Sequence, residues 1–286
     1  APPPAPGRRA RQTSHLAALG NGSAGGSGRS PTVKVAASDV EVLRRKDIAS
    51  LSPAEKRHLR ELLALLEPVP PTRRALRRTP ARRGDVDPRR TLKRMIATGE
   101  VTRPRRRRRA TRPRKVVLLI DVSGSMKPYA DALLRFAHVV ARRMPVEVCT
   151  LGTRLTRVTR QLRHRDPEQA MLAAARAVPD YEGGTRLGET LKVFLDRWGQ
   201  RGAARRAVVV ICSDGWERGD PTLLAEQARR LARLAHKVVW VNPHAGHEGY
   251  EPVQSGIAAA LPHVDRLLAG HSLDTLRALL EEVRLA

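Results

Sequence analysis

Apolar runs alternate with amphipathic stretches along the second part of the chain, from Val116 to the C-terminus. Val116 to Ile120 and Ala207 to Cys212 contain no polar residue except the final cysteine. Short runs of this kind are typical of strands that are buried on both faces, as in a parallel sheet. The alternation predicts an α/β fold with a doubly wound, mostly parallel sheet. The expected strands are 116–121, 146–151, 155–159, 207–212, 238–242 and 264–268, and the expected helices are 129–143, 167–177, 187–198, 221–235 and 272–284.

One pair of strands departs from the parallel pattern. The run 155–159 follows the run 146–151 after a short turn at Gly152 and Thr153. A parallel connection needs a crossover of a dozen or more residues, whereas antiparallel strands need only a short turn. We therefore expect 155–159 to be an antiparallel strand at the edge of the sheet.

The first part of the chain has a different composition. Residues 1–38 are rich in Pro, Gly, Ser, Ala and Arg without apolar periodicity, which predicts a disordered tail. Ser52, Pro53 and Glu55 form a helix start with a capping box, before an apolar face made of Leu59, Leu62, Leu63, Leu65 and Leu66. A second short helix is expected from Pro88 to Ala97. The resulting division is a tail at 1–38, a basic helical accessory region at 39–114 and an α/β domain at 115–286.

Positive charge is concentrated in that first part. The chain of 286 residues has a formal net charge of +26, with 54 Lys and Arg against 28 Asp and Glu. Residues 1–115 hold 30 of the basic and 9 of the acidic residues. The α/β domain is therefore close to neutral, and the basic character belongs to the segment before it.

Oxygen-bearing side chains follow the two buried runs. Asp121, Ser123 and Ser125 form an Asp-x-Ser-x-Ser turn directly after the first run, and Asp214 follows the second. Thr185 comes from a loop that begins with Gly183 and Gly184. Open α/β sheets bind ligands at the carboxyl ends of their strands, and carboxylate and hydroxyl oxygens suit Mg²⁺ or Mn²⁺. These side chains favour a metal site over the alternative that Ser and Asp only cap the helix expected near Pro128.

These residues also carry a family resemblance. Asp121-x-Ser123-x-Ser125, Thr185 and Asp214 match the metal-ion-dependent adhesion site of von Willebrand factor A (VWA) domains. From about Val40 to the C-terminus, the chain resembles the CoxE-like branch of that family. The supporting segments are DPRRTLKRMIATGE, LLIDVSGSM, GTRLTRVTRQL, YEGGTRLGETL, SDGWERGDP and VVWVNPHAGHEGYEP.

The resemblance implies a fold, a set of roles and a class of partner. VWA sheets have the strand order 3-2-1-4-5-6, which places Asp121 and Asp214 on neighbouring strands. Ser123 and Ser125 would bind the ion directly, Thr185 directly or through water, and Asp121 and Asp214 mostly through water. The open coordination position would take an acidic residue of a partner. CoxE-like proteins resemble partners of MoxR-type AAA+ ATPases in metalloenzyme maturation, such as that of carbon monoxide dehydrogenase.

Other functions lack their motifs. The sequence contains no P-loop, no Gly-x-Ser-x-Gly nucleophile elbow and no general base beside the Asp-x-Ser-x-Ser turn, so we expect no enzymatic activity. It also contains no apolar run of membrane-spanning length, and its first residues, APPPAPGRRARQTS, lack the apolar core expected of a signal peptide. Cys149 and Cys212 lie in two expected strands with a third between them, which predicts two reduced thiols in a cytoplasmic protein.

Three further features have competing interpretations. The run Arg105 to Arg109 suggests RNA or DNA binding, but no aromatic residue accompanies it, so we favour a solvated linker or an anchor for an acidic partner. His244 and His247 lack a third ligand for zinc. Trp216 is either an interface anchor beside the metal site or a buried packing residue, and Asp220 is expected to cap the next helix.

Overall fold

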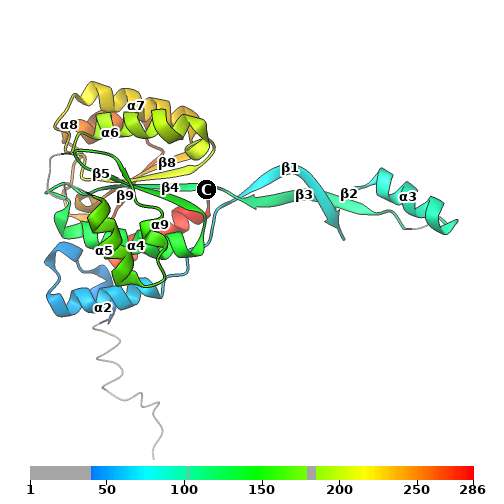
Figure 1. The fold of residues 1–286 in the computed structure, drawn as a ribbon, viewed down its shortest axis with the longest axis horizontal. Coiled ribbons are helices and arrows are strands. Elements are labelled where there is room, and N and C mark those ends of the chain that lie inside the picture. The colour runs from blue at the N-terminus through cyan, green and yellow to red at the C-terminus, as the bar shows by residue number, and fades with distance from the viewer. Residues whose placement is uncertain (1–39, 102, 179–184) are drawn as a thin grey trace, which may run out of the picture. The chain divides into compact units, whose positions relative to one another are not determined.

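A six-stranded sheet organises the C-terminal part of the fold. The computed structural model describes residues 40–101, 103–178 and 185–286. The strand order is β6-β5-β4-β7-β8-β9, and every neighbouring pair is parallel except β5 and β6. This confirms the expected sheet, including its antiparallel edge strand (Figure 1). The strands are β4 (Val116–Asp121), β5 (Val146–Leu151), β6 (Thr156–Arg157), β7 (Val208–Cys212), β8 (Lys237–Asn242) and β9 (Arg266–Ala269).

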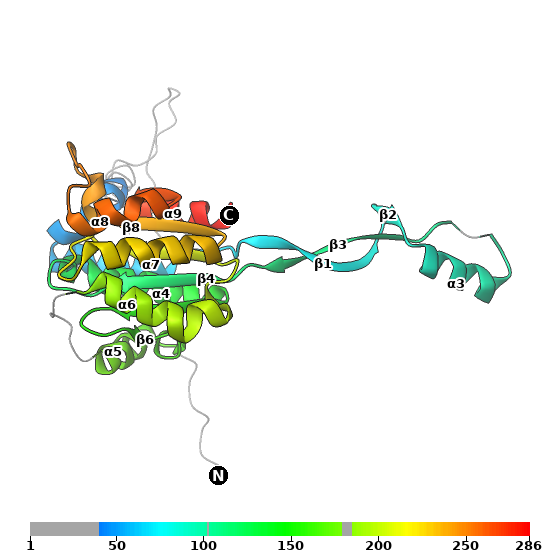
Figure 2. The same cartoon turned by 90° about the horizontal axis from the view of Figure 1, so that it is seen from above.

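Helices cover both faces of this sheet (Figure 2). α2, α4 and α9 contribute to the apolar core on one face, and α6, α7 and α8 contribute to the core on the other. Successive strand residues point to opposite faces, so Leu118 belongs to the first core and Leu119 to the second. The helices are α2 (Pro53–Ala64), α4 (Lys127–Arg143), α5 (Pro167–Ala177), α6 (Leu187–Phe194), which continues into the π-helix η3 (Leu195–Ala203), α7 (Pro221–Leu234), α8 (Ser255–Ala260) and α9 (Leu273–Arg284).

Helix α2 shares its core with the sheet domain. The side chain of Ser52 accepts a hydrogen bond from the backbone of Glu55, and the side chain of Glu55 accepts one from the backbone of Ser52, so the expected capping box is present. Leu59 and Leu63 are buried in the same core as α4. Leu65 does not belong to this apolar face: the helix ends at Ala64, and the Leu65 residue is 72% exposed. The predicted boundaries at 38/39 and 114/115 remain predictions, but residues 53–66 pack as part of the α/β core.

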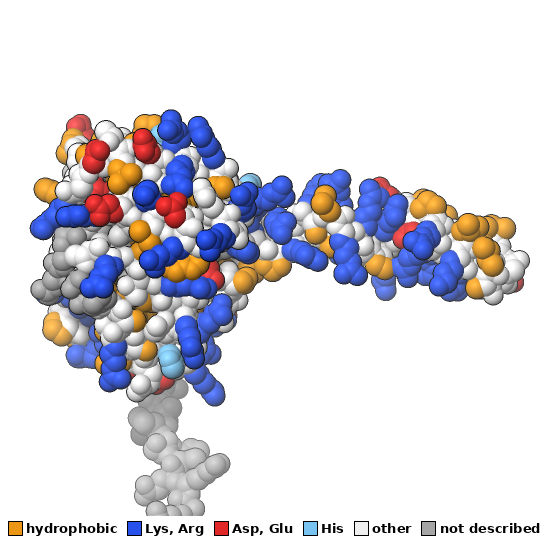
Figure 3. Space-filling view, turned by 45° about the horizontal axis from the view of Figure 1, so that its top comes forward, with side chains coloured by type: hydrophobic (Ala, Val, Ile, Leu, Met, Phe, Trp, Pro, Cys, Tyr) orange, Lys and Arg blue, Asp and Glu red, His pale blue; other side chains and the backbone are white. Residues whose placement is uncertain are grey.

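Residues 72–113, which we call the arm, form a separate small sheet. Its strands are β1 (Thr72–Ala81), β2 (Asp85–Val86) and β3 (Arg106–Pro113), in the antiparallel order β1-β3-β2. Helix α3 (Pro88–Thr98) lies between β2 and β3 in the chain, as the sequence predicts. Figures 1 and 2 show that the arm shares no sheet with β4 to β9, and Figure 3 shows Lys and Arg side chains along it.

The arginine run is therefore not a linker. Arg106 to Arg109 lie in β3 and pair with Ala81 to Arg78 of β1. The favoured interpretation as solvated linker was wrong because arginine has no strong strand preference, whereas pairing with β1 satisfies the backbone of the run. Arg106, Arg108 and Arg109 are exposed and Arg107 is half-buried. The solvation of most of the run was therefore predicted correctly, whereas the strand was not predicted.

No helix in the described ranges is long and apolar enough to cross a membrane.

Candidate metal site

Asp121, the last residue of β4, is the centre of a buried hydrogen-bond network. Its side chain is fully buried. Oδ1 accepts hydrogen bonds from the Ser123 backbone N–H at 2.9 Å and from Thr185 Oγ1 at 2.7 Å. Oδ2 accepts one from Ser213 Oγ at 2.7 Å. Both carboxylate oxygens are thus held by neighbours from three segments of the chain.

The turn after β4 brings two hydroxyl groups together. Ser123 Oγ and Ser125 Oγ lie 3.2 Å apart, with Ser123 buried and Ser125 exposed. Neither serine is the N-cap of the following helix: the N-cap of α4 is Met126, which makes no side-chain capping hydrogen bond. The helix-cap alternative is therefore wrong for this turn, and the serine oxygens remain available to a ligand.

Asp214, two residues beyond β7, provides a second buried carboxylate. Its Oδ1 accepts a hydrogen bond from the Trp216 backbone N–H at 3.1 Å, and its backbone oxygen accepts one from Asn242 Nδ2 at 3.1 Å. Its Oδ2 is buried and has no hydrogen-bond partner in the described structure. A buried carboxylate oxygen without a donor is costly, so this atom is the point in the site that most needs a ligand or water.

Burial also shapes the charge of the site. It raises the pKa of Asp121, because the carboxylate loses its water, while hydrogen bonds from Ser213, Ser123 and Thr185 act in the opposite direction. A divalent cation is the kind of neighbour that would favour the ionised carboxylate in such surroundings. The oxygen atoms of this site fit Mg²⁺ or Mn²⁺ better than a softer metal.

The fold brings together the five residues singled out by the sequence. Asp121 bonds to Thr185, Ser123 lies beside Ser125, and Ser213 joins Asp121 to the strand end that leads to Asp214. Their assignment as metal ligands remains a prediction. Gly183 and Gly184, which precede Thr185, lie outside the described residues.

Sequence reasoning did not identify several contacts that support the site, although the segment Trp216 to Arg218 was expected to shape its rim. Ser213 was passed over although it lies directly between a buried strand and Asp214, a position that could have identified it. Glu217 Oε2 accepts from the Gly188 backbone N–H at 2.8 Å, at the start of α6, so it ties the loop after β7 to the helix that follows Thr185. Asn242 Nδ2 also donates to the Tyr250 hydroxyl at 2.7 Å. The contacts of Ser213 with Asp121 and of Glu217 with Gly188 join segments distant in sequence, so a local pattern does not reveal the partners.

The rim of the site is now defined. Trp216 is 63% exposed, which favours the interface interpretation over buried packing. Asp220 Oδ1 accepts from the Thr222 backbone N–H at 2.8 Å and so caps α7, as predicted. A large exposed aromatic residue beside a polar site is a common anchor for a partner protein.

The two histidines of the Gly-rich loop have other neighbours. The His244 ring packs edge-on against Tyr129 with 5.9 Å between centroids, and His247 Nε2 lies 3.3 Å from Asp47 Oδ2. In the described ranges, no three His, Cys, Asp or Glu side chains are grouped so that they could hold a metal. The candidate site differs from such clusters because three of its five residues, Ser123, Ser125 and Thr185, contribute hydroxyl groups.

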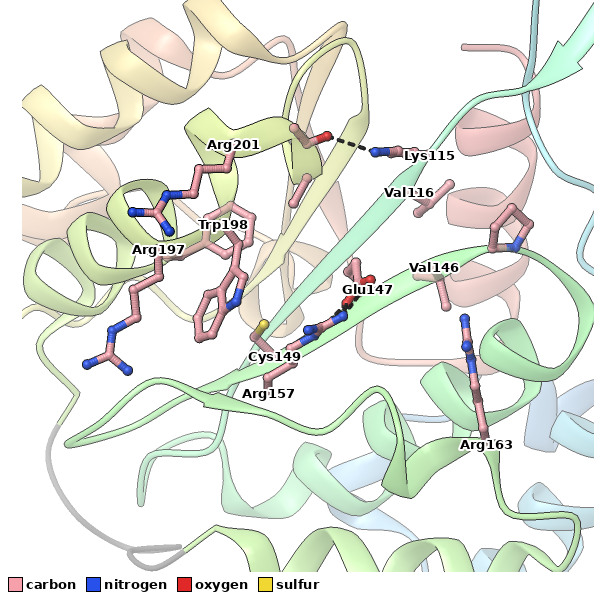
Figure 4. Close-up of a pocket in the computed structure, with 14 residues that line it drawn as sticks. Lys115, Val116, Val146, Glu147, Cys149, Arg157, Arg163, Arg197, Trp198 and Arg201 are labelled. Atoms are coloured by element: carbon pink, nitrogen blue, oxygen red, sulfur yellow. Dashed lines mark hydrogen bonds and ion pairs between the residues drawn. The ribbon is translucent and has the colours of Figure 1, made fainter.

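A pocket of about 500 Å³ lies at the other end of the strands (Figure 4). Val116 and Val146, the first residues of β4 and β5, line it together with Trp198. Arg157 makes a bidentate ion pair with Glu147, with both contacts at 2.8 Å. Because Asp121 is the last residue of β4, this pocket is separate from the candidate metal site.

Comparisons with known proteins agree with this fold. A family model described as "VWA domain containing CoxE-like protein" matches residues 58–276. No curated protein sequence matches the chain. Solved structures that resemble it include a von Willebrand factor type A protein from Catenulispora acidiphila (17% identity, TM-score 0.45, 63% of this chain and 43% of that one). Another is mussel byssus proximal thread matrix protein 1 with a zinc-occupied MIDAS motif (18% identity, TM-score 0.42, 60% of this chain and 44% of that one). A third is manganese-loaded Plasmodium vivax TRAP protein (16% identity, TM-score 0.42, 60% of this chain and 73% of that one).

The chain spans less than half the length of the Catenulispora and mussel proteins that it matches. At these levels of identity, the structural likeness concerns the fold alone. The family match carries more weight than these structural likenesses, because it extends over more than half of the chain.

Proposed function

This chain belongs to the CoxE-like family of VWA-domain proteins, and from that premise we propose that it is a non-enzymatic adaptor whose divalent-metal site binds an acidic residue of a partner protein. The observation that carries the proposal is Asp214 Oδ2, a buried carboxylate oxygen without a donor, in a site that already holds Asp121 and two neighbouring serine hydroxyls. VWA domains are generally interaction modules, which supports an adaptor over an enzyme.

Each residue has a proposed role at the metal. Ser123 and Ser125 would bind Mg²⁺ or Mn²⁺ directly, and Thr185 directly or through water. Asp121 would orient the Thr185 hydroxyl, and Asp214 would contribute its unpaired oxygen, mostly through water. The bound ion would supply positive charge and an open position for a carboxylate of the partner, and Trp216 would contact the partner beside it.

The proposed partner is a MoxR-type AAA+ ATPase. Family resemblance supports it, together with a role in the maturation of a metalloenzyme such as carbon monoxide dehydrogenase. In this scheme the ATPase supplies the work and the present chain supplies recognition of the client enzyme. A cytoplasmic setting fits the two buried, free thiols.

A binding experiment tests the proposal. Calorimetry with the purified ATPase would compare the wild-type chain with Ser123→Ala and Thr185→Ala, with and without EDTA. We expect metal-dependent binding that both substitutions weaken at least about tenfold. Ser255→Ala is the matched control, because Ser255 is exposed and lies outside the site. Equal binding in EDTA and in all variants would refute the metal-bridged contact.

RNA or DNA binding through the Arg-rich region is the alternative. It uses none of the residues at the metal site, so the two functions separate cleanly. If nucleic acid is the partner, affinity would fall steeply with salt and would drop when Arg105 to Arg109 are replaced by alanine, but EDTA would have no effect. Filter binding with the same set of proteins distinguishes the two.

A further inference from the structure

The arm (residues 72–113) carries a dense positive charge with few acidic residues among it. It contains 17 Lys and Arg and three Asp and Glu. Among its described residues there is one ion pair, between Arg78 and Asp85 at 2.8 Å. Arg106 to Arg109 are consecutive in β3, so their side chains alternate between the two faces of the ribbon. Both faces of the arm are therefore cationic, and Figure 3 shows Lys and Arg side chains along the face that it presents.

The arm also has little to stabilise it from within. Arg73 lies directly opposite Arg112, and Arg78 directly opposite Arg109. Like charges in such positions destabilise a strand pair. The third strand, β2, pairs with β3 at only two residues, and a ribbon of two strands alone is marginal in water. Ala75 and Asp87 are the buried residues among those described in the arm. Carboxylates from outside the chain would relieve this repulsion.

Helix α3 adds an unpartnered apolar stripe. The helix is well bounded: Asp87 caps its start, and Gly99 ends it with a φ of 70°. Leu92 and Ile96, four residues apart and so on one side of the helix, are 59% and 75% exposed. Arg89, Arg90, Lys93 and Arg94 are also exposed on the helix, and none of the helix residues is buried. Val101, just beyond the helix, is 90% exposed.

We propose that the arm is a docking element for an acidic cleft in a partner protein, and that the cleft ends in an apolar pocket for Leu92 and Ile96. This deepens the proposed adaptor function, on which it rests, by naming the chemistry of the partner's surface and adding a contact that does not involve the metal. The family match spans residues 58–276, a range that includes the arm.

The chemistry of the arm favours a protein cleft over two other polyanions. A lipid surface would meet one face of the ribbon and leave the arginines of the other face in water. Duplex nucleic acid would engage the arginines through its phosphates but would have no use for the exposed stripe of α3. Single strands are usually held by stacking on aromatic side chains, and the arm has none. An acidic cleft with an apolar end accommodates both faces and the stripe.

Site-specific photocrosslinking in the native host tests this. A photoreactive phenylalanine analogue replaces Ile96 in the full-length chain, and in a control chain it replaces Leu285, which is 71% exposed at the C-terminus. We expect a protein adduct at position 96 that survives nuclease treatment and is absent at position 285. The adduct is identified by mass spectrometry, and the captured protein is purified.

Binding of that purified protein to variants of the chain is the second part of the test. Leu92→Ser and Ile96→Ser should each weaken binding at least about tenfold, while Leu285→Ser should have no effect. A chain without the arm should not bind. In the deletion variant, a two-residue turn replaces residues 72–113. Such a turn fits because the Arg114 backbone N–H already donates to the Pro71 backbone oxygen at 2.7 Å.

Each other outcome overturns the docking proposal. A nuclease-sensitive adduct would show that the arm binds nucleic acid, and a lipid adduct would show that it binds a membrane surface. Equal adducts at positions 96 and 285 would show that the arm has no specific partner. Failure of the proposed metal contact gives a different result from failure of the arm. Binding that requires Leu92 and Ile96 but is unaffected by EDTA and by Ser123→Ala supports the arm and contradicts the metal contact. Binding that needs metal but tolerates Ile96→Ser does the reverse.

Discussion

Ser213 donates its hydroxyl to Oδ2 of Asp121 across two neighbouring parallel strands, at 2.7 Å. The same oxygen of Ser213 accepts from the Gly215 backbone N–H at 3.1 Å. One buried serine therefore connects the first carboxylate of the candidate site to the loop that carries the second. The geometry of both acidic residues depends on this contact.

Removing that hydroxyl should weaken metal binding without unfolding the protein. Ser213→Ala leaves Asp121 Oδ2 and the Gly215 N–H without their partner, so the carboxylate loses its orientation. We expect Mg²⁺ or Mn²⁺ affinity to fall about 10- to 100-fold, as for other residues that orient metal ligands. Calorimetric titration measures it, with Ser255→Ala as control. Unchanged affinity would show that Ser213 has no part in the site.

A glycine beside the site should resist substitution for two separate reasons. Gly215 has a φ of +81°, and an added Cβ would lie 2.5 Å from the Ile257 Cβ of α8. Gly249 has a similar φ of +76°, but its Cβ would meet nothing within 4 Å. Gly249→Ala should cost only the backbone strain of about 1–2 kcal/mol, whereas Gly215→Ala adds the overpacking cost of about 1–3 kcal/mol. Urea unfolding of both variants checks the difference, and equal losses would contradict it.

Helix α2 should contribute to the stability of the whole α/β domain. Leu63 is 1% exposed in the core beneath α4, and Leu65, two residues on, is 72% exposed. We expect Leu63→Ala to lower the free energy of unfolding by about 2–5 kcal/mol and Leu65→Ala to change it little. Unfolding followed by circular dichroism and by tryptophan fluorescence should show one cooperative transition, and Leu63→Ala should shift it equally in both signals. If only part of the signal responds to Leu63→Ala, α2 unfolds independently of the sheet.

The two cysteines should be free and unreactive in the folded protein. Cys149 lies on β5 and Cys212 on β7, with β4 between them, and they belong to the cores on opposite faces of the sheet. Burial raises the pKa of both thiols to about 12. At pH 8 a disulfide reagent should label neither thiol quickly until denaturant is added. An intramolecular disulfide in the non-reduced protein would contradict the strand order.

The same pKa shift predicts a loss of stability in alkali. The folded state keeps both thiol protons to a higher pH than the unfolded chain, whose thiols have a pKa near 9.0. Their contribution to stability is therefore complete below about pH 9 and is lost as the pH rises toward 12. Replacing both cysteines by alanine should flatten the fall in urea midpoint between these values, and an unchanged slope would contradict the assignment.

The sequence alone was sufficient for the architecture of the sheet domain. A fully apolar strand such as Val116 to Ile120 must be buried on both faces, so helices have to cover both sides of the sheet. The alternation of such strands with amphipathic stretches is compatible with few topologies. The metal-site candidates followed from the same pattern, because Asp121 and Asp214 come just after such runs. Local helix starts at Ser52 and Asp220 were equally visible, since capping involves neighbours only a few residues apart.

Tertiary structure decided the features that depend on distant partners. Arg106 to Arg109 form a strand because β1 offers a complementary backbone, which no local property of these four arginines could indicate. Ser213 and Glu217 acquired their roles from Asp121 and Gly188, which meet them only in the folded chain. Pattern thus determines which segments are buried, since burial is driven by each segment's own composition. Side-chain partners across the fold are set by where those segments finally lie.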